Sequence, residues 1–217
     1  MPFIKTISPG DARDDVLDMY RRQQSAWGYV PNYARVFSHR PEVLARWGRL
    51  LAEIKRPMST RRFELVTFAA ALELRNSACA LAHGKALLEF FSADDIVAIR
   101  NQDYDGVLSA AEQAMLRFAR QVAGDASRIT SGEVEALMKL GFSDDDVFDI
   151  ATTAAGRAFF TKILDALGVE CDASFSSLDD AFRKALIVGR PISCGRLERL
   201  PEQAAPVTAA GGARQHG

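Results

Sequence analysis

Residues 61–84 read RRFELVTFAAALELRNSACALAHG. Apolar side chains occur on nearly every face of the first part, which predicts a helix buried in the middle of the fold. A short break at Asn76 precedes a second helix. Cys79 and His83 are four residues apart on this second helix, so they share one face. With Glu64 on the helix before, the segment supplies a thiol, an imidazole and a carboxylate, the parts of a proton-coupled thiol site.

The remainder of the chain is also typical of helices. Polar residues that cap helix starts, most with an acidic residue three positions later, precede segments with apolar residues at helical spacing. No segment of convincing length alternates polar and apolar residues as a strand does. We therefore predict an all-α fold, with helix starts at Ser59 or Thr60, Ser92, Ser109, Thr130 and Ser143.

Composition limits the class of protein. The chain has 217 residues and a formal net charge of −1, which gives no general attraction for nucleic acid or an anionic membrane. No run of about 18 apolar residues and no secretory signal is found. The three cysteines, Cys79, Cys171 and Cys194, are too widely spaced for a disulfide framework. We expect a cytoplasmic protein without nucleic-acid or membrane partners.

The length suits a single domain. We expect one all-helical domain over residues 1–192, made of an N-terminal helical extension (about 1–57), a core (about 58–170) and a C-terminal segment (171–192). The end of the chain is rich in Ala, Gly and polar residues. Such a composition cannot bury a core, so we expect residues 193–217 to be a disordered tail.

The chemistry expected at Cys79 rests on its neighbours. A thiolate attacks peroxides and disulfides, and the first turn of a helix favours negative charge. His83 can take the proton, and Glu64 can orient the imidazole. A structural interpretation stays open, because buried cysteines often only fill space. A zinc site has three candidate ligands here, but no fourth ligand stands at motif spacing.

Glu64 poses a geometric question. It lies about 11 residues before the break, or roughly 16 Å along a helix. A simple antiparallel hairpin would not bring it to Cys79. Either the helices cross steeply, or Glu64 meets His83 by another route, such as a subunit boundary.

Glu64, Cys79 and His83 have the spacing of a known motif. The pattern resembles the alkylhydroperoxidase D-like and carboxymuconolactone decarboxylase family, whose reducing branch has Glu, eleven residues, then Cys-x-x-Cys-x-x-x-His. Segments 28–32, 39–41 and 164–169 also look like parts of the larger members, so the resemblance covers about residues 20–192. It implies an alkylhydroperoxidase D-like helical bundle that forms a homo-oligomer, a trimer or a dimer of trimers (a hexamer).

The chain departs from that motif at Asn76, which stands where the first cysteine would be. The resemblance implies a peroxidase with an antioxidant role. In this enzyme Cys79 would be the nucleophile, His83 the acid/base group and Glu64 a proton relay. No thiol is left nearby to resolve a sulfenic acid, so a disulfide within the motif is excluded and an external thiol reductant is required. Cys171 or Cys194 could replace it only within the roughly 7 Å Cα separation that a disulfide spans.

Two other functions remain open. The decarboxylase branch works on lactone acids by acid/base chemistry, so His83 and Glu64 could act on a small lactone or carboxylic acid while Cys79 merely packs. Alternatively the protein is a non-catalytic oligomeric binding protein. None of these interpretations calls for a cofactor or metal. The aromatic turn with Trp27, Tyr29 and Tyr33 could roof a substrate pocket or pack in the core.

Overall fold

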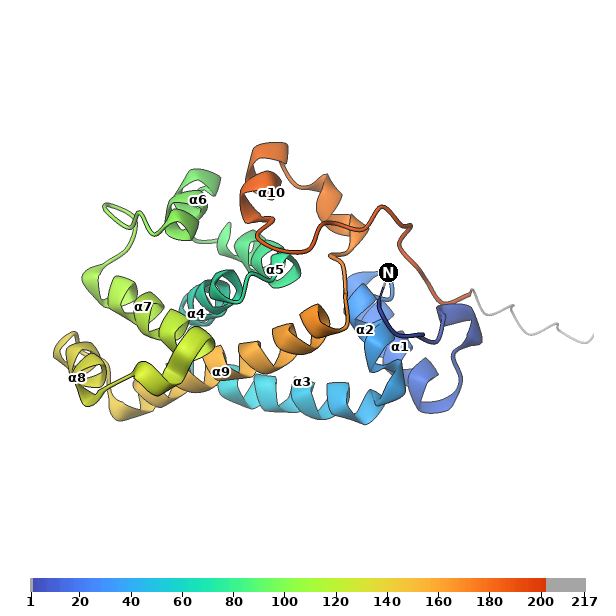
Figure 1. The fold of residues 1–217 in the computed structure, drawn as a ribbon, viewed down its shortest axis with the longest axis horizontal. Coiled ribbons are helices and arrows are strands. Elements are labelled where there is room, and N and C mark those ends of the chain that lie inside the picture. The colour runs from blue at the N-terminus through green and yellow to red at the C-terminus, as the bar shows by residue number, and fades with distance from the viewer. Residues whose placement is uncertain (1, 202–217) are drawn as a thin grey trace, which may run out of the picture.

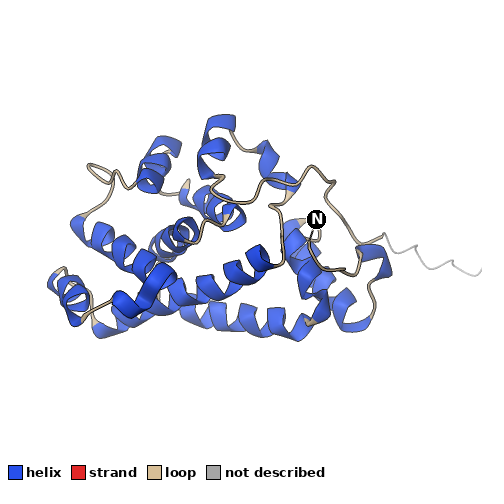
Figure 2. Cartoon of the chain, viewed as in Figure 1, coloured by secondary structure: helices blue, strands red, loops and turns tan. Residues whose placement is uncertain are grey.

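The computed structural model describes residues 2–201. This part of the chain folds into helices and loops without a strand (Figure 2), which confirms the predicted all-α class. The α-helices are α1 (Asp14–Trp27), α2 (Asn32–Val36), α3 (Pro41–Lys55), α4 (Thr60–Glu73), α5 (Ser77–Leu87), α6 (Ala93–Asn101), α7 (Ala110–Asp125), α8 (Ser131–Lys139), α9 (Asp144–Ala166) and α10 (Asp180–Leu186). None of these helices is long and apolar enough to cross a membrane.

Helix α4 is the centre of the fold. Its residues from Phe63 to Leu72 are all buried, as the apolar sequence on every face predicts. It packs against α5, α7 and α9 (Figure 1). The elements that carry the candidate site are therefore held by the same helix.

The predicted helix starts are confirmed. Ser59 caps α4 by accepting a hydrogen bond from the backbone N–H of Arg62. Full capping boxes, in which the cap residue and an acidic residue three positions later satisfy each other's backbone N–H groups, open four further helices. These boxes begin at Ser92 (α6), Ser109 (α7), Thr130 (α8) and Ser143 (α9).

The N-terminal helices build a second apolar cluster beside the main core. In Figure 1, α3 runs alongside α9, and α1 and α2 lie near the end of this pair. The second cluster joins residues of α1 and α3, such as Tyr20 and Trp47, with Phe160 and Leu164 of α9. It also includes Cys79, so the start of α5 lies where the extension meets the core.

The segment after α10 returns along the body of the molecule. The hydroxyl of Ser77 accepts hydrogen bonds from the backbone N–H groups of Val188 and Gly189, at 3.1 and 2.7 Å. Further on, the carbonyl of Glu198 accepts a bond of 2.8 Å from the N–H of Val30. Residues 193–201 of the expected disordered tail are thus in contact with the domain, which places the start of any tail later than residue 193. The rest of that tail, 202–217, lies outside the described residues.

Helix α9 ends in a Schellman motif at Gly168. The N–H of Gly168 bonds to the carbonyl of Asp165, and the N–H of Val169 bonds to that of Leu164. Gly168 has φ +72°, in the left-handed region, and a Cβ there would lie 2.6 Å from the ring of Phe3. The conformation therefore favours glycine, and a larger residue would also have to displace the exposed ring of Phe3.

We expect Gly168→Ala to lower the free energy of unfolding by about 1–2 kcal/mol, the cost of a left-handed alanine. The matched control is Gly48→Ala in α3, where a Cβ would meet nothing within 4 Å. This control should raise stability by up to about 1 kcal/mol because alanine favours the helix. Urea denaturation followed by circular dichroism measures both changes, and equal midpoints for the two variants would contradict the expectation.

Candidate active site

A cavity of about 440 Å³ lies between the N-terminal extension and the core. Cys79 and His83 reach it from α5, Glu64 from α4 and Arg157 from α9. The structure thus brings the three residues predicted from the sequence to one cavity, and it adds an arginine. Much of the remaining lining is apolar and aromatic, including Trp27, Tyr33, Trp47 and Phe160.

Glu64 and His83 meet within one chain. Oε2 of Glu64 lies 2.6 Å from Nδ1 of His83. Glu64 stands 11 positions before Arg75 in the break and His83 eight positions after it, so the two lie about 16 and 12 Å along their helices. An antiparallel pairing of α4 and α5 therefore brings Glu64 next to His83 rather than Cys79, and no subunit boundary is needed.

The environment sets the charges of this pair. Burial would raise the pKa of Glu64, but the hydrogen bond from His83 and the positive charges of Lys55 and Arg157 outweigh it, and the pKa is lowered. Burial and the charge of Arg157 lower the pKa of His83 despite Glu64. Glu64 is thus ionised and can only accept, so the hydrogen of the neutral imidazole is on Nδ1. The Nε2 of His83 is left with a lone pair.

Cys79 lies in the first turn of α5 and is 5 % exposed. Burial raises the pKa of its thiol, while the positive charge of Arg157 opposes this. Nη1 of Arg157 lies 3.8 Å from Sγ of Cys79. A guanidinium at this distance stabilises a thiolate, since it places a permanent positive charge beside the sulfur.

Arg157 is the site residue that the sequence analysis did not identify. It is 5 % exposed, and its Nε has no hydrogen-bond partner within residues 2–201. Its guanidinium also lies 5.7 Å from the ring centroid of Phe160. The available signal was a single arginine within the apolar stretch from Ala154 to Phe160 of α9, because a buried charge needs a partner.

Several solved structures are similar to this protein in fold, although neither a protein-family model nor a curated protein sequence matches the chain. An uncharacterized peroxidase-related protein from Ralstonia eutropha JMP134, described as an alkylhydroperoxidase AhpD core, matches with a TM-score of 0.66 and 20 % identity, over 87 % of this chain and 98 % of that one. The chain has the AhpD-like fold. A second peroxidase-related protein, from Silicibacter sp. TM1040, matches with a TM-score of 0.64 and 19 % identity, over 79 % and 92 % of the two chains.

A third similar structure is named as a debrominase and not as a peroxidase-related protein. The debrominase Bmp8, as a cysteine-to-alanine variant in complex with 2,3,4-tribromopyrrole, matches with a TM-score of 0.67 and 14 % identity, over 86 % of this chain and all of that one. At such identities the likeness extends to the fold alone. Proteins with the AhpD-like fold thus include both a debrominase and proteins named as peroxidase-related.

Asn76 has a structural task at the position where the resemblance expects a cysteine. It is the N-cap of α5, and its Oδ1 accepts a hydrogen bond of 2.9 Å from the backbone N–H of Cys79. Its Nδ2 donates to Oδ2 of Asp165 on α9, at 3.0 Å. One buried amide therefore fixes the first turn of α5 and joins it to α9.

The other two cysteines are also free. Cys171 is buried, its thiol donates to the carbonyl of Arg190, and burial raises its pKa to about 12. Cys194 is exposed. Within residues 2–201 no three histidine, cysteine or acidic side chains are placed to hold a metal ion. The neighbour of the Cys79 sulfur is instead the cation Arg157, which would repel a zinc ion.

The predicted aromatic roof is divided between two places. Trp27 and Tyr33 line the cavity, and Trp27 is 46 % exposed. Tyr29 is instead buried, with its hydroxyl 2.7 Å from that of Ser174. The turn therefore contributes both to the cavity and to the packing of the C-terminal segment.

We expect Asn76→Ala to lower the free energy of unfolding by about 2 kcal/mol, because it removes a helix cap and the hydrogen bond to Asp165. Asn76→Ser keeps a capping oxygen and should restore about half of that loss. Chemical denaturation measures both variants. If Asn76→Ala is as stable as the wild type, the amide does not join α5 to α9 in the way the structure indicates.

We expect Arg157→Leu to raise the pKa of Cys79 further, since it removes the positive charge beside Sγ. At a pH below that pKa, alkylation of Cys79 should slow roughly tenfold for each unit of the rise. Arg157→Lys keeps the charge, so its rate of Cys79 alkylation should lie between those of the wild type and Arg157→Leu. The measurement is the pH profile of iodoacetamide labelling, located by peptide mass, and coinciding profiles for wild type and Arg157→Leu would contradict the stated role.

Proposed function

We propose that this protein is a peroxidase-like oxidoreductase in which Cys79 is the only redox-active thiol of the site. The observation that carries the proposal is the contact between Arg157 and the Cys79 sulfur, in the cavity that also holds the Glu64–His83 pair. A cation beside a buried cysteine favours the thiolate. A neutral histidine on the same helix face can take the proton that the thiol loses.

In the first step, Nε2 of His83 takes the proton of the Cys79 thiol, and the thiolate attacks the terminal oxygen of a hydroperoxide. The S–O bond forms as the O–O bond breaks, and the leaving alkoxide receives the proton from His83. The products are a sulfenic acid on Cys79 and an alcohol. Arg157 stabilises the thiolate, and Glu64 stabilises the protonated imidazole.

An external thiol completes the cycle. It attacks the sulfur of the Cys79 sulfenic acid, releasing water and forming a mixed disulfide. A second external thiol then releases Cys79 as a thiol and leaves as the disulfide of the reductant. An external reductant is proposed because Asn76 replaces the nearby cysteine and Cys171 is a buried thiol of high pKa. The apolar, aromatic lining favours an organic hydroperoxide over hydrogen peroxide. We further propose that the protein is a homo-oligomer, as the resemblance implies, and that it is cytoplasmic, as its cysteine usage suggests.

A second candidate function uses the same residues without redox chemistry. The ionised Glu64 and neutral His83 form an acid/base pair, and burial keeps Cys79 as a thiol. Arg157 would then hold the carboxylate of a small lactone or carboxylic acid. In this case Cys79 only lines the cavity.

We expect cumene hydroperoxide, with dithiothreitol as reductant, to be consumed by the wild type and not by Cys79→Ser. His83→Ala should be slower by about a hundredfold, because the proton acceptor is lost. Dimedone should label Cys79 after a peroxide pulse, and Cys171→Ser is the matched control that should retain activity.

Three outcomes would contradict the peroxidase proposal. If dimedone does not label Cys79, the proposal is wrong. A turnover that survives Cys79→Ser but not His83→Ala would favour the acid/base enzyme, and a ligand bound without turnover would favour a binding protein.

A converse experiment restores the missing thiol. Positions 76 and 79 are three residues apart at the start of α5, within the reach of a disulfide. We expect Asn76→Cys to form a disulfide with Cys79 on peroxide treatment and to protect Cys79 from over-oxidation. Thiol counting and intact mass measure this, with Asn76→Ser as control. Sulfenic or sulfinic acid accumulating in both variants alike would contradict the expectation.

A further inference from the structure

A second polar site lies away from the Cys79 cavity and shares no lining residue with it. A cavity of about 350 Å³ is lined by Leu72, Arg75, Arg100, Arg120, Ile187 and Val188. Its three arginines come from different segments, namely the α4–α5 break, α6 and α7. Within residues 2–201 this lining includes no acidic side chain. The lining is therefore strongly positive, and the carboxylate of Glu73, which pairs with Arg120 but is not part of this lining, offsets only part of that charge.

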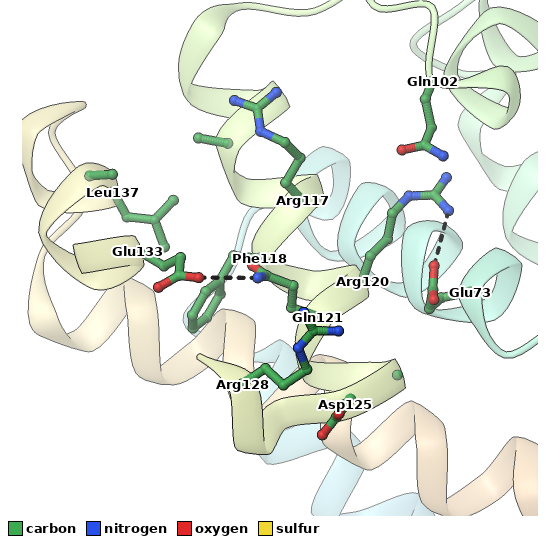
Figure 3. Close-up of a pocket in the computed structure, with 13 residues that line it drawn as sticks. Glu73, Gln102, Arg117, Phe118, Arg120, Gln121, Asp125, Arg128, Glu133 and Leu137 are labelled. Carbon is green, nitrogen blue, oxygen red and sulfur yellow. Dashed lines mark hydrogen bonds and ion pairs between the residues drawn. The ribbon is translucent and has the colours of Figure 1, made fainter. Parts of the chain in front are cut away.

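Arg120 is the most buried of the three. Its side chain is 12 % exposed, and Nη1 lies 3.6 Å from Oε2 of Glu73. Its Nε and Nη2 are buried and have no hydrogen-bond partner in the described part of the chain. Figure 3 shows the guanidinium of Arg120 between the carboxylate of Glu73 and the amide of Gln102. Buried donors without acceptors are costly, so these two nitrogens indicate an acceptor supplied from outside.

The backbone holds Arg75 in place at this cavity. Arg75 has φ +55°, a left-handed conformation that is uncommon for residues other than glycine. Its carbonyl packs so closely on Gly189 that a Cβ at Gly189 would lie 1.9 Å from the oxygen. Its Nε donates to the carbonyl of Val188 at 3.4 Å. The segment after α10 thus holds the Arg75 backbone at the cavity and offers an acceptor to its exposed side chain.

Arg100, in the last turn of α6, completes the set. Its Nη1 donates to Oδ1 of the neighbouring Asn101 at 2.7 Å, and the side chain belongs to an exposed residue. The guanidinium can therefore close on a ligand without losing a buried contact. A guanidinium fork matches the oxygens of phosphate and carboxylate groups.

The larger cavity of about 720 Å³ beside it has a different balance of charge. Arg120 lines both cavities, and the larger one adds Arg117 and Arg128 but also Glu73, Asp125 and Glu133. Figure 3 shows these side chains, with Glu73 next to Arg120 and Glu133 on the opposite side of the group. With as many acidic as basic residues, the larger cavity has no net preference for an anion. The smaller cavity, with three arginines and no acidic lining residue among residues 2–201, keeps a net positive charge beside the single carboxylate of Glu73.

We propose that the cavity formed by Arg75, Arg100 and Arg120 binds a small, multiply charged oxyanion of the phosphate type. Three guanidinium groups call for an anion with more than one negative charge, and a phosphate group carries about −1.5 to −2 at neutral pH. The volume is at the lower end of ligand pockets, which suits a small head group. The site is independent of the proposed reaction at Cys79.

The test is titration calorimetry of the full chain with pyrophosphate at low ionic strength. We expect saturable binding at one site, weakened about tenfold or more by Arg100→Gln and by Arg120→Gln, as the loss of a charged hydrogen bond implies. Inorganic phosphate should bind more weakly than pyrophosphate, and acetate should not compete. Added salt should weaken binding because the attraction is electrostatic.

The matched control is Arg46→Gln, which removes an exposed arginine of α3 that pairs with Glu42. Its affinity for pyrophosphate should equal that of the wild type. Absence of saturable binding, or equal loss in Arg46→Gln and Arg100→Gln, would overturn the proposal. Arg120→Gln leaves Glu73 unpaired and could fail to fold. In that case the pyrophosphate affinity of Arg100→Gln is the deciding measurement, because Arg100 is exposed and its substitution removes no buried contact. Peroxide turnover plays no part in this readout, so failure here and failure of the proposed function are distinguishable.

Discussion

The buried carboxylate of Glu64 is the constraint on which the site depends. It lies on the central helix α4, where every residue from Phe63 to Leu72 is buried, and a charge in such a place must be paired. The partners are His83 on α5 and Lys55 at the end of α3, whose Nζ lies 3.7 Å away. The Glu64 side chain therefore contacts both neighbouring helices, and it helps to hold α5 and the end of α3 in place against α4.

Arg157 is the counterpart of Glu64 in the same cavity. Two opposite charges that line one cavity stabilise each other, and both act on the neutral groups near them. The positive charge of Arg157 depresses the pKa of His83 and opposes the rise in the pKa of Cys79. The imidazole thus stays a base and the thiol becomes easier to ionise. An apolar surround makes each of these effects larger than it would be in water.

Local chemistry explains which features were predictable from the sequence. Capping boxes at Ser92 and Ser143 depend on residues three positions apart, and the burial of α4 follows from its own composition, so both could be recognised in advance. The shared face of Cys79 and His83 is equally local. The AhpD-like fold itself was indicated by the spacing of Glu64, Cys79 and His83.

The missed features join distant segments. Arg157 is 78 positions from Cys79, and the Asn76–Asp165 bond spans 89. Such contacts depend on how α5 and α9 cross, which no spacing reveals. The contact of Glu64 with His83 was equally hard to predict, because it depends on how α4 pairs with α5. The contact of Glu198 with Val30 likewise joins segments far apart in the sequence, so the composition of residues 193–201 could not reveal it.

The bonds from Val188 and Gly189 to Ser77 have a consequence for the order of folding. Ser77 opens the helix that carries Cys79, yet its partners are more than a hundred positions later in the chain. During synthesis from the N-terminus, this helix emerges long before the segment that secures its first residue. A nascent chain can assemble α4 and its neighbours while the thiol site is still open. The site is therefore among the last parts of the domain to reach its final geometry.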